Sequence, residues 1–256
     1  MVNLAKLAVS KKIKLSRLKK FVNNVRTVSD TKRSFYTLHT RPINTIYRRV
    51  VEELMVEMHL LSVNVNFNYN PIYALGIVTT FDRFMADYKP EQDKESIFHA
   101  LIKSVEADPN VYRQDTQRLQ SLASDLPVSD LIGWLSQSNP QERDGELQNI
   151  LAVIANNQNF KYSRLFAIGL YALLESSDPE LVKDEKRCND ALSSIANGLQ
   201  ISDEKLTKDL ELYRSNLEKM SQAITVMADM VAAERKKREQ RGQASDSSAT
   251  PPTEKE

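Results

Sequence analysis

Apolar residues recur at helical spacing along most of the chain, most regularly between Arg41 and Asn64. Six of them are three or four positions apart, which places them on one stripe of a 3.6-residue helix: Ile43, Tyr47, Val50, Leu54, Met58 and Leu61. Pro42 suits the first helical position, where a backbone N–H would have no helical partner. The pattern predicts a helix over 42–62 with its apolar stripe buried.

The opposite face of this predicted helix is charged. Arg48 precedes Glu52, and Arg49 precedes Glu53, by four positions. Ion pairs at this spacing contribute only about 0.2–0.5 kcal/mol each. Two interpretations stay open, a solvated face and a surface that contacts a partner, and the candidate partner-binding residues here are Arg48, Arg49, Glu52 and Glu53.

Helix starts recur along the chain as an N-capping residue followed by proline. There are four such dipeptides: Asn70-Pro71, Asp108-Pro109, Asn139-Pro140 and Asp178-Pro179. The chain has only 6 glycines, and no Asn-Gly or Asp-Gly turn separates alternating apolar segments, so strands should be few or absent. The predicted fold class is all-α, with one helical domain over 25–200. We expect helices over 29–39, 42–62, 71–87, 91–107, 109–124, 129–137, 140–157, 160–176, 179–196 and 203–240.

The last predicted helix has a different pattern, a heptad. Apolar residues alternate steps of four and three: Leu206, Leu210, Tyr213, Leu217, Met220, Ile224, Met227 and Val231. The flanking e and g positions are mostly small or neutral, whereas a self-specifying dimer usually carries Glu and Lys there. Packing within the chain, a different protein and a homodimer all remain open, with a monomer favoured over a homodimer. Candidate partner-binding residues are Leu210, Tyr213, Leu217, Met220, Ile224 and Met227.

The asparagine-rich stretch 64–70 is the longest loop expected in the first half, because asparagine side chains bond their own backbone in turns. Phe67 and Tyr69 are expected to anchor this loop to the core. The coiled-coil-like helix is assigned to 203–241, and 242–256, which has no large apolar residue, is expected to be a disordered tail.

Residues 1–24 form a basic leader in which cations alternate with apolar residues. It is expected to be flexible, and it could also bind an anionic membrane surface, where each Lys or Arg contributes about 1 kcal/mol. The candidate membrane-surface residues are Lys11, Lys12, Lys14, Arg17, Lys19 and Lys20. A second basic cluster, Arg235 to Arg238 with Arg241, suits the C-terminal end of a helix dipole.

Signs of enzymatic or cofactor chemistry are weak. No two glycines are close enough for a phosphate-binding loop. Among the 3 histidines, only His99 shares a helix face with a carboxylate four positions away, that of Glu95, so no metal site, cofactor or catalytic residue is assigned. The lone Cys188 is expected to be a surface or half-buried structural thiol. A net charge of +1 provides no overall field for binding nucleic acid. A nucleic-acid-binding module and an enzyme with an unrecognised site are the alternatives to an interaction protein.

Three stretches carry a resemblance to a known family: VRTVSDTKRSFYTLHTRPIN, NFNYNPIYALGIVTTFDRFMADYKPE and, far downstream, NFKYSRLFAIGLYALLE. Together with the helix between the first two, they resemble the thylakoid formation protein family. The resemblance implies an all-helical, non-enzymatic protein that supports photosystem II assembly and repair at the cytoplasmic face of the cyanobacterial thylakoid membrane, or in the plastid stroma. It also implies association with an FtsH-type membrane protease complex, with photosystem II components as further candidate partners. No apolar run approaches the roughly 18 residues that cross a bilayer, so membrane contact would be peripheral.

Overall fold

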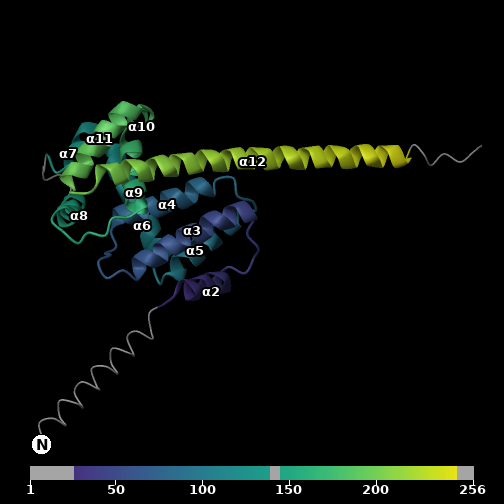
Figure 1. Ribbon diagram of the computed structural model, residues 1–256, viewed down its shortest axis with the longest axis horizontal. Coiled ribbons are helices and arrows are strands. Elements are labelled where there is room, and N and C mark those ends of the chain that lie inside the picture. The colour runs from purple at the N-terminus through teal and green to yellow at the C-terminus, as the bar shows by residue number, and fades with distance from the viewer. Residues whose placement is uncertain (1–25, 139–144, 247–256) are drawn as a thin grey trace, which may run out of the picture. The chain divides into compact units, whose positions relative to one another are not determined.

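The computed structural model describes residues 26–138 and 145–246, and all regular secondary structure in these ranges is helical (Figure 1). The predicted all-α class, with a long C-terminal helix, is confirmed. The helices are α2 (Val28–Leu38), α3 (Thr45–Ser62), α4 (Pro71–Phe84), α5 (Asp93–Ser104), α6 (Pro109–Asp125), α7 (Val128–Leu135), α8 (Gly145–Ala155), α9 (Arg164–Ser177), α10 (Pro179–Lys183), α11 (Glu185–Gly198) and α12 (Asp203–Asp246). The chain forms two compact units, Met1–Leu210 and Glu211–Glu256.

The capping signals place the helix starts well. Asn70, Asp108 and Asp178 each cap a helix whose first residue is the following proline, as predicted. The fourth dipeptide, Asn139-Pro140, lies outside the described residues. The leader with its six candidate membrane-surface cations, Lys11, Lys12, Lys14, Arg17, Lys19 and Lys20, lies outside them too, as do residues 247–256.

Several helix boundaries differ from the expected ones by a few residues, and two of the differences have a clear local cause. The helix expected from residue 42 begins at Thr45, because the Asn44 side chain accepts a hydrogen bond from the Ile46 N–H at 3.2 Å and caps it there. The helix expected over 179–196 is two helices. It breaks at Asp184, whose extended backbone ends α10 and whose carboxylate accepts from the Arg187 N–H at 3.1 Å to start α11.

Helices α4 and α9 form the centre of the first unit. Most residues of both are buried, and Figure 1 shows α4, α6 and α9 between α2, α3 and α5 on one side and α7, α8, α10 and α11 on the other. Glycines allow α4 and α9 to touch along their backbones. A Cβ on Gly76 would overlap the Leu165 carbonyl oxygen, and a Cβ on Gly169 would overlap that of Ile72.

The reciprocity of these contacts reflects an internal repeat that the sequence analysis missed. Counterparts in the two halves lie 93 positions apart through α4 and α9, and each of these helices is 14 residues long. The matched pairs are Phe67 with Phe160, Tyr69 with Tyr162, Asn70 with Ser163, Ala74 with Ala167, and Gly76 with Gly169. The contacts repeat as well. The ring centres of Phe67 and Tyr73 are 4.9 Å apart and those of Phe160 and Phe166 are 5.0 Å apart, both in edge-to-face geometry.

The repeat extends on both sides of the central helices. In α3 the residues Leu54, Met58 and Leu61 are buried, and so are their counterparts in α8, Leu147, Leu151 and Ile154. Beyond the central helices, the second half contains one extra residue relative to the first. The chain then leaves α5 and α11 in the same way, through a residue with left-handed backbone, Glu106 (φ 63°) after α5 and Gln200 (φ 56°) after α11. The Tyr69 hydroxyl donates to Asp115 of α6 at 2.6 Å, and the Tyr162 hydroxyl donates to Asp209 of α12 at 2.9 Å. The predicted anchoring of the 64–70 loop by Phe67 and Tyr69 is confirmed by these contacts.

Two buried histidines make the stability of the fold depend on pH. His59 pairs with the Thr31 hydroxyl at 2.9 Å, and His39 pairs with the Ser96 hydroxyl at 3.0 Å. Burial lowers the pKa of both and outweighs the opposing charges of Asp93 at His39 and of Asp30 at His59, while Arg41 and Arg26 add to the lowering. Below the ordinary histidine pKa of about 6.5, the two side chains therefore bind protons in the unfolded chain more readily than in the native state.

We therefore expect stability to be full above about pH 6.5 and to fall as the pH drops below that value. Urea unfolding of the whole chain at pH 7.5 and 5.5 measures the loss. The double variant His39→Gln, His59→Gln should be less stable at pH 7.5 and should show a flatter decline between the two values. Parallel declines for the variant and the natural chain would show that other groups are responsible.

Candidate partner-binding groove on helix α3

An open groove of about 1010 Å³ runs along one face of α3 in the first unit. One wall is α3 and the other is the segment that leads into α9. Its lining is Thr45, Arg48, Arg49, Glu52, Glu53, Val56, Glu57, Leu60, Leu61 and Asn64 on one side, and Lys161, Tyr162, Ser163 and Arg164 on the other. All four α3 residues expected at a partner surface, Arg48, Arg49, Glu52 and Glu53, therefore line it together.

The second wall is held in place by specific contacts. Arg164, the first residue of α9, pairs with Glu57 of α3 at 2.7 Å. Tyr162 donates to Asp209 at 2.9 Å, and the Lys205 ammonium lies 4.9 Å from the centre of its ring. Burial, reinforced by the Asp209 hydrogen bond, raises the pKa of Tyr162, so its hydroxyl stays a donor. The Ser163 hydroxyl caps α9 by accepting from the Phe166 N–H at 3.1 Å.

Two apolar side chains are exposed between the charged ends of the groove. Val56 is 37% exposed and Leu60 is 57% exposed, one helical turn apart on α3. Together they add exposed apolar surface to a concave site that is otherwise lined by polar residues. Neither was predicted as a contact residue from the sequence, because both lie on the charged side of the helix.

The carboxylates of the groove are already paired. Glu53 accepts from Arg49 at 3.0 Å, as predicted. The expected Arg48–Glu52 ion pair is not formed; Glu52 instead accepts from the Tyr36 hydroxyl at 2.6 Å and pairs with Lys32 at 3.0 Å. These contacts lower the pKa of Glu52, and burial with the Glu52 hydrogen bond raises that of Tyr36 to about 12.

Two cations remain unpaired. Within the described part of the chain, neither Arg48 nor Lys161 has a carboxylate within ion-pairing distance. Arg48 lies on α3 and Lys161 on the opposite wall. The groove thus combines an apolar pair with an excess of positive charge.

The predicted heptad of α12 divides between the two units. In the first unit Leu210 is buried, together with Leu206. In the second unit Tyr213 and Met220 are buried, Leu217 and Ile224 are partly exposed, and Met227 is exposed. An apolar strip follows on the exposed surface of α12: Val226, Met227, Met230 and Val231. Binding of a partner protein at the predicted heptad positions of α12 stays a prediction.

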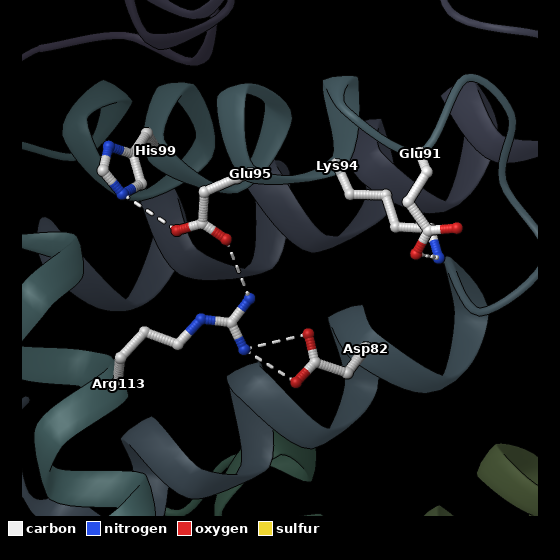
Figure 2. Close-up of polar contacts among 6 residues, drawn as sticks. All are labelled: Asp82, Glu91, Lys94, Glu95, His99 and Arg113. Atoms are coloured by element: carbon white, nitrogen blue, oxygen red, sulfur yellow. Dashed lines mark hydrogen bonds and ion pairs between the residues drawn. The ribbon is translucent and has the colours of Figure 1, made fainter.

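A polar cluster joins α4, α5 and α6 (Figure 2). The Arg113 guanidinium donates to both Asp82 carboxylate oxygens, at 2.9 and 2.7 Å, lies 3.5 Å from Glu95, and stands 4.0 Å from the centre of the Phe98 ring. Glu95 also pairs with His99 at 3.0 Å. Each carboxylate already has a cationic partner, so the cluster acts as a clamp between helices. Within residues 26–138 and 145–246, no group of three or more His, Cys, Asp or Glu side chains is placed to hold a metal ion.

Cys188 was expected at or near the surface, and that prediction is wrong. Its side chain is fully buried in α11, beside the buried Ala191 and Leu192 of the same helix. The charged residues next to it in sequence point elsewhere, because α11 buries only one face. None of the helices in the described ranges combines the length and the apolarity that crossing a bilayer requires.

Known proteins resemble this chain in both sequence and fold. The profile of the thylakoid formation protein family matches residues 27–242. Protein Thf1 of Nostoc punctiforme is 69% identical over 235 residues, covering 92% of this chain and 100% of that protein. Protein Thf1 of Gloeothece citriformis is 54% identical, covering 86% of this chain and 97% of that protein. A solved structure of Psb29 matches with a TM-score of 0.72 at 46% identity, covering 83% of this chain and 98% of that one. By sequence and by fold, the chain belongs to the thylakoid formation protein family.

Proposed function

We propose that this chain is a non-enzymatic interaction protein that works at the cytoplasmic face of the cyanobacterial thylakoid membrane. There it supports photosystem II assembly and repair by associating with, and stabilising, an FtsH-type protease complex. The observation that carries the proposal is the family match over residues 27–242, with relatives that extend along nearly the whole chain.

The structure supports the proposal through the surfaces it offers. The α3 groove presents two exposed aliphatic side chains and Arg48 on a rigid helix, with Lys161 on the opposite wall, and α12 presents the apolar strip of Val226, Met227, Met230 and Val231. Rigid helices with exposed apolar residues suit helix-in-groove recognition. The carboxylates and cations of the polar cluster that joins α4, α5 and α6 satisfy one another, which is the arrangement of a structural contact.

A capture experiment from detergent-solubilised cyanobacterial thylakoids tests the association. The tagged full chain should recover FtsH-type subunits, and Arg48→Glu with Arg49→Glu, or Met230→Glu with Val231→Glu, should reduce the recovery at least several-fold. These positions are exposed, so the variants should keep the thermal stability of the natural chain. Deleting residues 203–256 is less informative, because it removes Leu206 and Leu210 from the core of the first unit.

A tag-only bait and the surface variant Val153→Asp on α8 serve as controls. Val153 is 68% exposed and belongs neither to the lining of the α3 groove nor to the apolar strip of α12. Recovery of FtsH-type subunits at the level of the tag-only bait would refute the proposed association.

A further inference from the structure

We infer that the α3 groove binds an acidic amphipathic helix of a partner protein, with its apolar residues on Val56 and Leu60 and its carboxylates on Arg48 and Lys161. This inference rests on the proposed function, since it gives the chemistry of the partner at that site. Four observations carry it: the apolar pair, the charge balance, the second wall and the comparison with the other half of the repeat.

The apolar pair sets the shape of the occupant. Val56 and Leu60 are four positions apart, so their side chains project from the same face of α3, about 6 Å apart along the axis. The matching spacing in a partner is that of apolar residues at i and i+3 or i+4, which is the pattern of an amphipathic helix. Because α3 is 18 residues long, a helix of similar length could lie along the groove.

The charges that line the groove favour a negatively charged binding partner. Glu52, Glu53 and Glu57 are bound to Lys32, Arg49 and Arg164, so their charges are already compensated. Arg48 and Lys161 form no such ion pair and lie on opposite walls, and Arg48 acts on Glu52 only through a charge attraction that helps lower the pKa of that carboxylate. Carboxylates of an incoming helix would pair with them, whereas a basic helix would meet the same cations and be repelled.

The three glutamates also disfavour a polyphosphate surface. A lipid headgroup layer or a nucleic acid would place many phosphates along the groove, beside Glu52, Glu53 and Glu57, and only two cations there are free. A helix can position a few carboxylates and leave its other positions neutral. The geometry therefore favours a protein segment over an extended polyanion.

The internal repeat provides a comparison within the same molecule. In α8 the counterpart of Leu60 is Val153, which is also exposed, but the counterpart of Val56 is Asn149. The exposed aliphatic pair is thus present in α3 and broken in α8. The docking surface belongs to one half, and Val153 is the matched control position for Leu60.

Direct binding to the full chain tests the inference. The probe is a fluorescein-labelled, stapled helical peptide of about 18 residues, with leucines at helical i, i+4 and i+7 spacing and glutamates at most other positions. A second peptide has the same leucines with lysine in place of glutamate. We expect saturable binding by fluorescence anisotropy for the acidic peptide and binding about tenfold weaker, or none, for the basic peptide.

Variants then locate the contact. Leu60→Asp should weaken the acidic peptide about tenfold, Val153→Asp should leave it unchanged, and Arg48→Glu with Lys161→Glu should weaken it several-fold and reduce its salt dependence. Circular dichroism and thermal unfolding check that each variant is folded. Equal affinity for the two peptides, equal effects of Leu60→Asp and Val153→Asp, or no binding up to about 1 mM peptide, would overturn the inference.

The outcomes separate this inference from the proposed function. If Leu60→Asp still captures the protease at the natural level and the peptide does not bind, the proposed function stands and the groove is not its docking site. If the acidic peptide binds as expected and no protease is recovered by the natural chain, the groove chemistry stands and the protease association fails.

Discussion

Gly169→Ala is expected to prevent stable folding, with a loss of more than about 4 kcal/mol, because the new methyl group has no free space. It would overlap the Ile72 carbonyl oxygen, and it would also lie 2.9 Å from the carbonyl carbon of Ile72. These are backbone atoms, which cannot move aside by changing rotamer. α4 and α9 would have to separate along their length, and most residues of both are buried. Gly76→Ala should have an equally large effect through the Leu165 carbonyl.

Urea unfolding and the yield of soluble protein measure this loss. Gly145→Ala is the matched control, because a Cβ there meets nothing closer than the Asn149 side chain at 3.9 Å, in ordinary contact. Alanine at that position of α8 should be neutral or stabilising by up to about 1 kcal/mol. A Gly169→Ala chain that unfolds at the natural urea midpoint would show that the two helices do not approach so closely.

Phe98→Ala should cost about 3–5 kcal/mol, the second largest effect that we expect. The side chain is fully buried in α5, its ring lies 5.2 Å from that of Phe81 in α4, and the Arg113 guanidinium of α6 covers its face at 4.0 Å. Removing the ring leaves a cavity between three helices and removes the aromatic face that the Arg113 guanidinium covers.

Urea unfolding of two further variants separates the contribution of the Phe98 side-chain volume from that of the Arg113 hydrogen bonds. Phe98→Leu keeps most of the volume and should cost less than Phe98→Ala. Arg113→Lys keeps the charge but loses the paired hydrogen bonds to Asp82, for a cost of about 1 kcal/mol. If Phe98→Ala cost no more than Arg113→Lys, the ring would not be the main support of this junction.

Local signals predicted most of the fold, because helix caps and apolar periodicity act over a few residues. Asn70, Asp108 and Asp178 cap helices where they were expected to. The same signals misplaced the start of α3, where Pro42 was favoured over the capping Asn44, and they missed the break at Asp184. In both cases one side-chain hydrogen bond decides the boundary.

The candidate site could be predicted only in part. The charged face of α3 follows from spacing within one helix, but the second wall is more than a hundred residues further along the chain, as the Glu57–Arg164 pair shows. The internal repeat escaped notice although both of its copies carried the family resemblance. Between residues 66–76 and 159–169 only the Asn, Phe, Tyr, Ala and Gly positions are identical, so the correspondence emerges from repeated contacts.

The repeat also separates what the two halves share from what one half has gained. α6 ends after 17 residues, whereas its counterpart α12 continues for 44. Two once-identical subunits, joined by gene fusion, would give this pattern if one copy later acquired an extension. The extension would then be free to vary, because α6 shows that one half of the repeat needs no such extension. Among relatives, the length of this final helix should therefore vary more than the number of residues between the glycines that correspond to Gly76 and Gly169.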